Sequence, residues 1–218
     1  MDIGQILQDN GLKNATIINN HQEFSMPKLW QDILECETFD EKKKIALNKW
    51  KLFSEFLPKT IKLLENNLID ILVVTDSGQI KLLYLFEIND NILIYEGHIP
   101  TFEHSFLKNI PLDIRSFYTE IHNGWFESVS GGLGFLALDD IQFLDELEWG
   151  ILDEIPTPNI DLSKTYYIFH NAGSGYLCIN IENIETPEYL IWWSNKEPKF
   201  DIGFWSFIDS WIEIGLTN

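Results

Sequence analysis

Adjacent carboxylates are the residues of this chain whose spacing comes nearest to a chemical site. Asp139 lies beside Asp140, and Asp153 lies beside Glu154. Paired carboxylates can divide the roles of general acid and base, or hold a hard metal ion. Neither pair has the ligand spacing of a known metal-binding loop. We therefore interpret the pairs as a solvated acidic surface or, as the functional alternative, a partner-binding surface, and we expect no metal or cofactor.

The histidines and cysteines do not form a recognisable site either. None of the histidines lies in H-x-x-x-H, or in H-x-E with a following C-x-x-C. His122 is interpreted through the dipole of a preceding helix, and His170 through hydrogen bonding beside a turn. Cys36 and Cys178 are far apart in the sequence and are predicted to be buried, reduced thiols. We expect no catalytic histidine.

Two glycine-rich stretches, Ser130–Gly134 and Asn171–Gly175, invite comparison with phosphate-binding loops. A phosphate cradle needs a strand, a glycine turn and then a helix N-terminus. Both stretches instead lie between predicted strands, so they are predicted to be turns. Ser174 is not in a nucleophile elbow, because position 172 is alanine. The chain is therefore not expected to be an enzyme.

The charge is strongly negative and uneven. Fifteen Lys and Arg face 34 Asp and Glu, which gives a net charge of −19. No Lys or Arg lies between Arg115 and Lys164, where many acids cluster. This pattern excludes nucleic acids and anionic membranes as partners and suits a basic protein partner. The alternative is that the acidic residues only keep the protein soluble.

Composition indicates a folded protein with a large core. The 218 residues are 45% hydrophobic and 14% aromatic. No apolar run approaches the ~18–20 residues of a membrane span. The N-terminus lacks the basic and apolar regions of a signal peptide, so we expect a cytoplasmic protein.

Residues 1–110 are predicted to form helices and a β-meander. Helices are expected over 2–9, from Pro27 and from Asp40, with a kink or a new start at Pro58. Turns at 76–78 and 89–91 separate expected strands over 69–75, 79–88 and 92–96. No flexible linker follows, so we expect residues 1–110 and 111–218 to pack as one body.

Residues 110–125 are predicted to form a short docking helix. Asn109 is the expected N-cap, Pro111 fits the first turn, and Asn123-Gly124 ends the helix. The apolar positions Ile114, Phe117, Tyr118 and Ile121 follow the helical period.

The rest of the chain is predicted to add strands and a closing helix. Strands are expected over 125–129, 135–138, 165–170, 175–182 and 188–194, and a last helix over 201–214. Asp139-Asp140 is expected to cap a short helix over Ile141–Leu147, and 150–164 to be an exposed loop. Trp125 is predicted to be in the core, whereas Trp149 fits either the core or an exposed hot spot. The fold class is α+β, with helices packed on a mainly antiparallel sheet.

The order of these motifs resembles the SUKH superfamily over roughly residues 108–214. The resemblance rests on Ile110-Pro111, the aromatic helix, Asn123-Gly124, the strand Tyr166–Phe169, the turn and strand Gly173–Ile179, Tyr189–Trp193 and Phe204–Ile208. About half of the chain precedes the opening motif, which usually lies near the N-terminus, and Tyr176 stands where an acidic residue often follows the glycine turn.

The resemblance implies a SUKH-like fold with an N-terminal extension, and a non-enzymatic immunity protein that neutralises a cognate bacterial toxin. The partner would be a toxin domain with a basic surface, and a homodimer is possible. The expected contact residues are Asp139, Asp140, Asp145, Glu146, Glu148, Trp149, Asp153 and Glu154. The alternatives are a regulatory or scaffolding protein of the same fold, and a carboxylate-dependent hydrolase.

Overall fold

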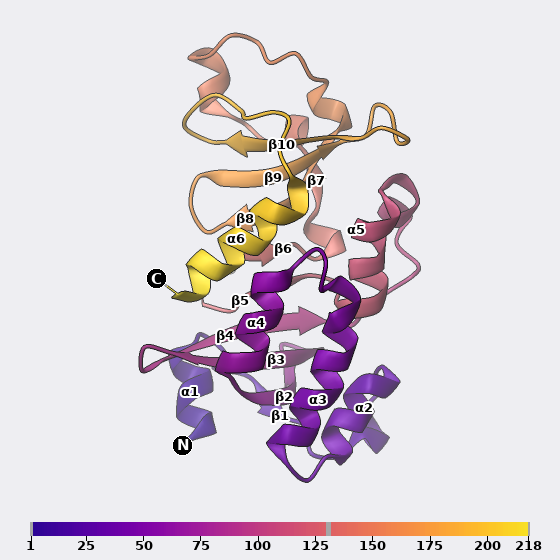
Figure 1. Cartoon of the computed structure of the whole chain (residues 1–218), viewed down its shortest axis with the longest axis vertical. Helices are drawn as coiled ribbons and strands as arrows, with labels where there is room; N and C mark the ends of the chain where they lie inside the picture. Colours follow the sequence, from indigo (N-terminus) through magenta and orange to yellow (C-terminus); the bar gives the residue numbers. More distant parts are fainter. Residues whose placement is uncertain (1, 130–131, 218) are drawn as a thin grey trace.

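A single antiparallel sheet runs through both halves of the chain. The computed structural model describes residues 2–129 and 132–217, and these contain a ten-stranded sheet with the order β1-β2-β3-β4-β5-β6-β8-β9-β10, while β7 also pairs with β8. Figure 1 shows the strands stacked from β1 at the bottom to β10 at the top. The strands are β1 Thr16–Ile17, β2 Leu68–Asp76, β3 Gln79–Ile88, β4 Asn91–His98, β5 Trp125–Glu127, β6 Leu133–Phe135, β7 Gln142–Phe143, β8 Thr165–Asn171, β9 Gly175–Asn180 and β10 Glu188–Trp193.

Two tight turns set the register of the first three long strands. Ser77 and Gly78 both have positive φ, as do Asn89 and Asp90. Two consecutive left-handed residues match the twist of a hairpin. The predicted strands of this meander are confirmed, and β8, β9 and β10 are consecutive antiparallel neighbours, as the sequence predicted. The α+β, antiparallel class is therefore confirmed.

Among the described residues, five helices pack on one face of the sheet, here called the helix face. Figure 1 shows α3, α4 and α6 in front of the sheet. Their inward side chains join Tyr84, Trp125 and Phe135 in a large aromatic core. The expected helix start at Pro58 is confirmed. The helices are α2 Lys28–Glu35, α3 Phe39–Trp50, α4 Pro58–Asn67, α5 Leu112–Ser116 and α6 Phe204–Thr217.

The N-terminus of α4 is capped by a residue from α6. Leu57, at the N-cap position, makes no side-chain cap. Instead, the buried carboxylate of Asp209 accepts hydrogen bonds from the backbone amides of Lys59 and Thr60, at 3.0 and 2.8 Å, and from the Thr60 hydroxyl at 2.8 Å. This contact joins the N-terminal half of the chain to its last helix, and a carboxylate suits the positive end of a helix.

The predicted helix over 110–125 is shorter and begins later than expected. Asn109 belongs to the preceding 3-10 turn, Ser105–Asn109, and Pro111 occupies the N-cap position. The helix continues as a π-helical turn, Phe117–Ile121. Gly124 has a φ of 85°, and a Cβ there would lie 2.7 Å from the amide nitrogen of Ala137. Glycine is therefore required at this junction.

The other face, here called the second face, has two separate covers. Helix α1, Ile3–Asp9, packs on one end of it, and Leu7 contacts a cluster that includes Leu83 and Ile94. Segment 142–164 covers the other end, where Leu144 and Trp149 pack around Trp192. Residues 150–164 are thus only in part the exposed loop that was expected, because the apolar side chains of β9 and β10 on this face need to be covered.

The helix predicted after Asp139-Asp140 does not form. The chain makes a 3-10 turn at Leu138–Asp140, the short strand β7 and another 3-10 turn at Leu144–Glu146. Phe143 pairs with Tyr166 of β8 and stacks on its ring at 3.8 Å between centroids. Tertiary pairing therefore overrides the local capping signal. The predicted turn Ser130–Gly134 lies partly outside the described residues, because Ser130 and Gly131 are not described.

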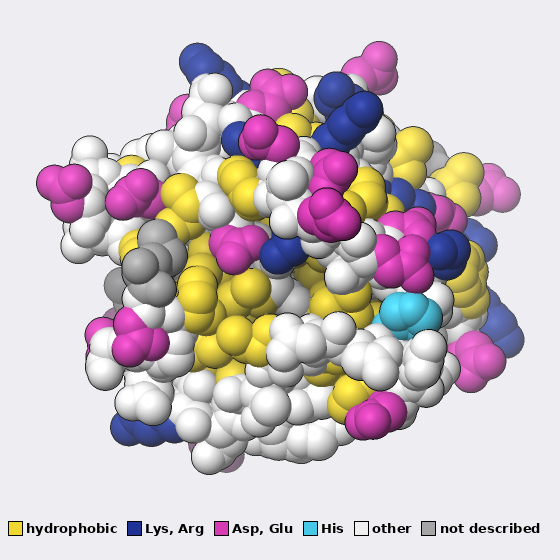
Figure 2. Space-filling model, turned by 90° about the horizontal axis from the view of Figure 1, so that it is seen from below, with side chains coloured by type: hydrophobic (Ala, Val, Ile, Leu, Met, Phe, Trp, Pro, Cys, Tyr) yellow, Lys and Arg dark blue, Asp and Glu magenta, His cyan; other side chains and the backbone are white. Residues whose placement is uncertain are grey.

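The free edge of β2 is closed by side chains. β1 pairs with Val74 and Thr75, and within the described part of the chain Ile71 has no ladder partner on that side. Lys42 donates to the Ile71 carbonyl at 3.1 Å and to Asp70, which accepts from the Ile71 amide. Viewed from this end, Figure 2 shows a hollow with hydrophobic side chains around charged ones. Charged side chains of this kind protect an edge from strand pairing.

Candidate binding surface and its polar pocket

One row of paired residues crosses the second face. Directly paired residues of antiparallel strands point to the same side, so the row shows what that face carries. The row is Leu72, Leu83, Glu96, Phe126, Gly134, His170, Tyr176 and Trp192. The leucines lie under α1, and Trp192 lies under segment 142–164. The two apolar clusters thus leave a polar middle between them.

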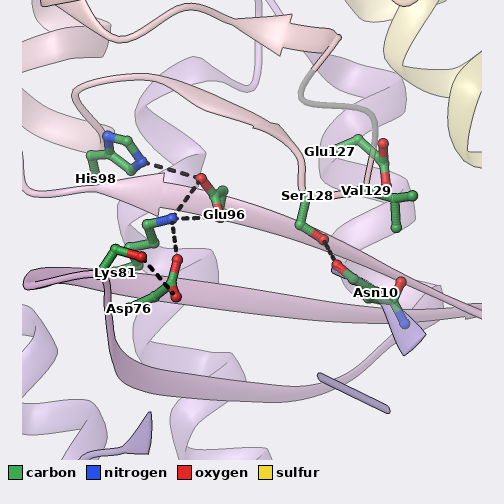
Figure 3. Close-up of polar contacts among 9 residues, drawn as sticks. Asn10, Asp76, Lys81, Glu96, His98, Glu127, Ser128 and Val129 are labelled. Carbon is green, nitrogen blue, oxygen red and sulfur yellow. Dashed lines mark hydrogen bonds and ion pairs between the residues drawn. The ribbon is translucent and has the colours of Figure 1, made fainter. Parts of the chain in front are cut away.

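A buried group of charges occupies this middle. Lys81 contacts Asp76 and Glu96, each at 3.1 Å, and the imidazole Nε2 of His98 lies 3.3 Å from Glu96 Oε1. Figure 3 shows the side chains converging from the ends of β2, β3 and β4. Lys81 is only 9% exposed and Glu96 only 5%. Desolvating such a pair often costs more than its attraction returns, so this cluster is poorly explained by stability alone.

A pocket of about 480 Å³ opens beside this cluster, at the rim of the sheet where β3 begins and β4 ends. Ile80, Ile99 and Ala137 supply apolar walls, while Asp139 and Asp140 lie on the side of the 3-10 turn. The full lining is Gly78, Gln79, Ile80, His98, Ile99, Asn123, Ala137, Asp139 and Asp140. The structure therefore brings two of the predicted contact residues together with His98.

A hydrogen-bonded chain fixes His98 from the opposite face. Trp50 Nε1 donates to the Tyr84 hydroxyl at 3.1 Å, which lies 2.8 Å from His122 Nε2, and His122 Nδ1 lies 3.3 Å from the His98 carbonyl. A Cβ at Gly97 would lie 2.4 Å from the His122 ring, so glycine is needed for this approach. The chain thus links the aromatic core to the pocket.

His122 is neutral, contrary to the dipole interpretation. It is buried, and this burial lowers the pKa of its imidazole to about 3. A neutral ring with its proton on Nδ1 can donate to the His98 carbonyl and accept from the Tyr84 hydroxyl. Desolvation therefore outweighs any helix-dipole effect on this histidine.

The other predicted acids lie on the surface of segment 142–164. Asp139 and Asp140 are also exposed, and Asp139 lies 3.5 Å from His104. None of the predicted acids is paired with a Lys or Arg among the residues the structure describes. Within the segment, the predicted acids that are exposed are Asp145, Glu146, Glu148, Asp153 and Glu154.

Trp149 anchors this segment. Its Nε1 donates to the Leu144 carbonyl at 2.6 Å, and its ring packs edge-on against Tyr176 and Trp192. The side chain is half-buried, so only part of it is available to a partner. Trp125 is fully buried, as predicted.

The remaining predicted features have structural explanations. Gly173 lies in the turn between β8 and β9, where Asn171 accepts from the amides of Gly173 and Gly175. His170 contacts the Gly173 carbonyl, as expected. Cys178 is buried, and burial raises the pKa of its thiol, whereas Cys36 is partly exposed, contrary to expectation. Within the described ranges, no group of three or more potential ligands is placed to hold a metal ion.

Sequence reasoning did not find the buried cluster. Its signal is present, since Lys81, Glu96 and His98 interrupt strands that are otherwise apolar. A two-residue turn at Asn89-Asp90 places Lys81 directly opposite His98, which puts the three side chains on one face. Working out the register of the hairpin from its turn could therefore have revealed the cluster.

Comparison of the chain with protein-family models, curated proteins and solved structures found no match. Among the described residues, no helix is long and apolar enough to cross a membrane.

Proposed function

We propose that this chain is a non-enzymatic immunity protein of the SUKH type, which binds a cognate bacterial toxin domain and blocks its active site. The observation that carries the proposal is the exposed acidic surface from Asp139 to Glu154. Its carboxylates are without Lys or Arg partners among the described residues, so they are free to pair with a basic protein. Complementary fields of this kind raise association rates and select partners.

The arrangement of the second half of the chain also supports this proposal. The family-like motifs fall on a helix followed by antiparallel strands and a closing helix, in the order that the resemblance implies. The acidic segment is held against the sheet by Leu144, Trp149 and Leu152, so its charges are presented on an ordered support. An ordered surface loses less conformational entropy on binding than a disordered one.

The toxin surface that suits this segment is a basic groove, such as one that binds an anionic substrate. An acidic protein in that groove would exclude the substrate without any chemistry of its own. The toxin is expected to be encoded next to this chain, and a toxin-domain gene immediately upstream would identify it.

The proposal is tested by reversing charge on the acidic surface. Asp139, Asp140, Asp145 and Glu146 are replaced together by lysine, and growth is measured in cells that express the cognate toxin. We expect protection to be lost while the variant stays folded, since exposed charges contribute only ~0–1 kcal/mol to stability.

The matched control reverses four exposed acids outside this surface, Glu55, Glu65, Glu182 and Glu185, and changes the net charge equally. Full protection by the control and none by the test variant supports the proposal. Full protection by both variants contradicts it.

A further inference from the structure

The pocket beside His98 combines three properties that suit a long cationic side chain. Its walls include Ile80, Ile99 and Ala137, which can pack against an aliphatic stem. Asp139 and Asp140 lie at its rim, where they can accept hydrogen bonds from an ammonium or guanidinium group. Its volume of about 480 Å³ accommodates one such side chain.

The buried cluster adds negative potential behind the pocket. The carboxylates of Asp76 and Glu96 share the single ammonium group of Lys81. The cluster as a whole therefore carries a formal negative charge when His98 is neutral. Glu96 contacts His98, which lines the pocket. A charge in a poorly hydrated place is screened less than one at the surface. The potential in the pocket therefore favours a cation.

The position of the pocket is fixed rather than adaptable. His98 is held through its carbonyl by His122, and Asn123 accepts a hydrogen bond from the Leu138 amide at 2.8 Å. This second contact ties the 3-10 turn that carries Asp139 and Asp140 to the end of the docking helix. A preformed site orders fewer groups on binding.

We propose that this pocket receives a lysine or arginine side chain of the partner protein and is the anchor point of the acidic surface. The identity of that protein as a toxin rests on the proposed function, but the preference of the pocket for a cation does not. The remaining acids, from Asp145 to Glu154, would steer the partner toward this point.

The test uses small probes and the whole chain. ¹⁵N-labelled protein is titrated with N-acetyl-arginine amide and N-acetyl-lysine amide, and N-acetyl-citrulline amide serves as the uncharged analogue of arginine. We expect saturable shifts of the Gly78, Ile99 and Ala137 amides with at least one cation and none with citrulline. A variant with Asp139→Asn and Asp140→Asn should bind about tenfold more weakly.

A second variant, with Glu182→Gln and Glu185→Gln, removes the same amount of charge outside the acidic surface, and as the matched control it should bind the probes normally. Three results would overturn the proposal that the pocket binds a cation: equal shifts with citrulline, equal weakening in both variants, or shifts spread along 142–154. None of these results would decide the proposed function, which the growth assay tests separately. Normal probe binding in a chain that gives no protection would overturn the proposed function alone.

Discussion

The two faces of the sheet differ in composition, because one carries a continuous aromatic core and the other carries buried charges. On the helix face, Trp50 packs against Tyr84, Phe117 and Trp125 in a continuous aromatic core. On the second face, two small apolar clusters leave Lys81 and Glu96 between them. The helix face accounts for most of the apolar burial, whereas the second face keeps buried charges that a purely structural role would not need. Under the proposed function, the helix face mainly supplies stability and the second face supplies the buried charges beside the binding pocket.

The largest expected effect is on the helix face. Trp50→Ala should lower the free energy of unfolding by ~3–5 kcal/mol, because a fully buried indole leaves a cavity. Phe126→Ala is the matched change in the polar middle of the second face, where the ring is partly exposed, and it should cost less than ~2 kcal/mol. Urea unfolding monitored by circular dichroism measures both. Equal losses would break the distinction between the faces.

A smaller loss is expected at the contact between α4 and α6. Asp209→Ala removes a buried acceptor of three hydrogen bonds and should cost ~2–3 kcal/mol. Glu213→Gln on the same helix removes only an exposed ion pair with Lys59 and should cost less than ~1 kcal/mol. If the two variants unfold at the same urea concentration, the tertiary cap contributes nothing.

His122, which links the two faces of the sheet, should make the stability of the protein depend on pH. The ordinary pKa of 6.5 applies to unfolded His122, whereas burial lowers it to about 3 in the folded protein. As pH falls below 6.5, the unfolded state takes up a proton that the folded state does not. His122 therefore removes ~1.4 kcal/mol of stability per pH unit until pH nears 3, and its contribution is constant above 6.5.

Unfolding at pH 7 and pH 5.5, compared with His122→Gln, isolates this effect. The variant should be less stable at pH 7 but should lose less stability on acidification than the unaltered chain. An identical pH dependence would show that His122 is not held neutral.

Local sequence signals predicted the meander and the helices well. They failed where contacts between residues far apart in the sequence determine the structure. The turn residues at 76–78 and 89–91 and the helical period around Trp50 act within a few positions, so the meander and the helices could be predicted. The cap from Asp209 is supplied by a helix about 150 positions away, and Phe143 is drawn into a strand by Tyr166. The acidic surface was visible as composition, but its pocket depends on strand register.

The smallest effect on stability is expected from the acidic surface itself. Neutralising Asp153→Asn and Glu154→Gln together should change the unfolding free energy by less than ~0.5 kcal/mol, because both carboxylates are exposed. The same variant should slow association with the toxin modestly. A large loss of stability would mean that these acids serve folding rather than binding.

Whether the acidic surface recruits a basic toxin can be read from the association rate constant with the purified cognate toxin at several salt concentrations. We predict a steep fall as salt rises, because charges separated by more than ~8 Å are screened at physiological ionic strength. The lysine variant at Asp139, Asp140, Asp145 and Glu146 should associate slowly at every salt concentration. Equal rates for this variant and the unaltered chain, with no dependence on salt, would show that the acidic surface does not recruit the toxin.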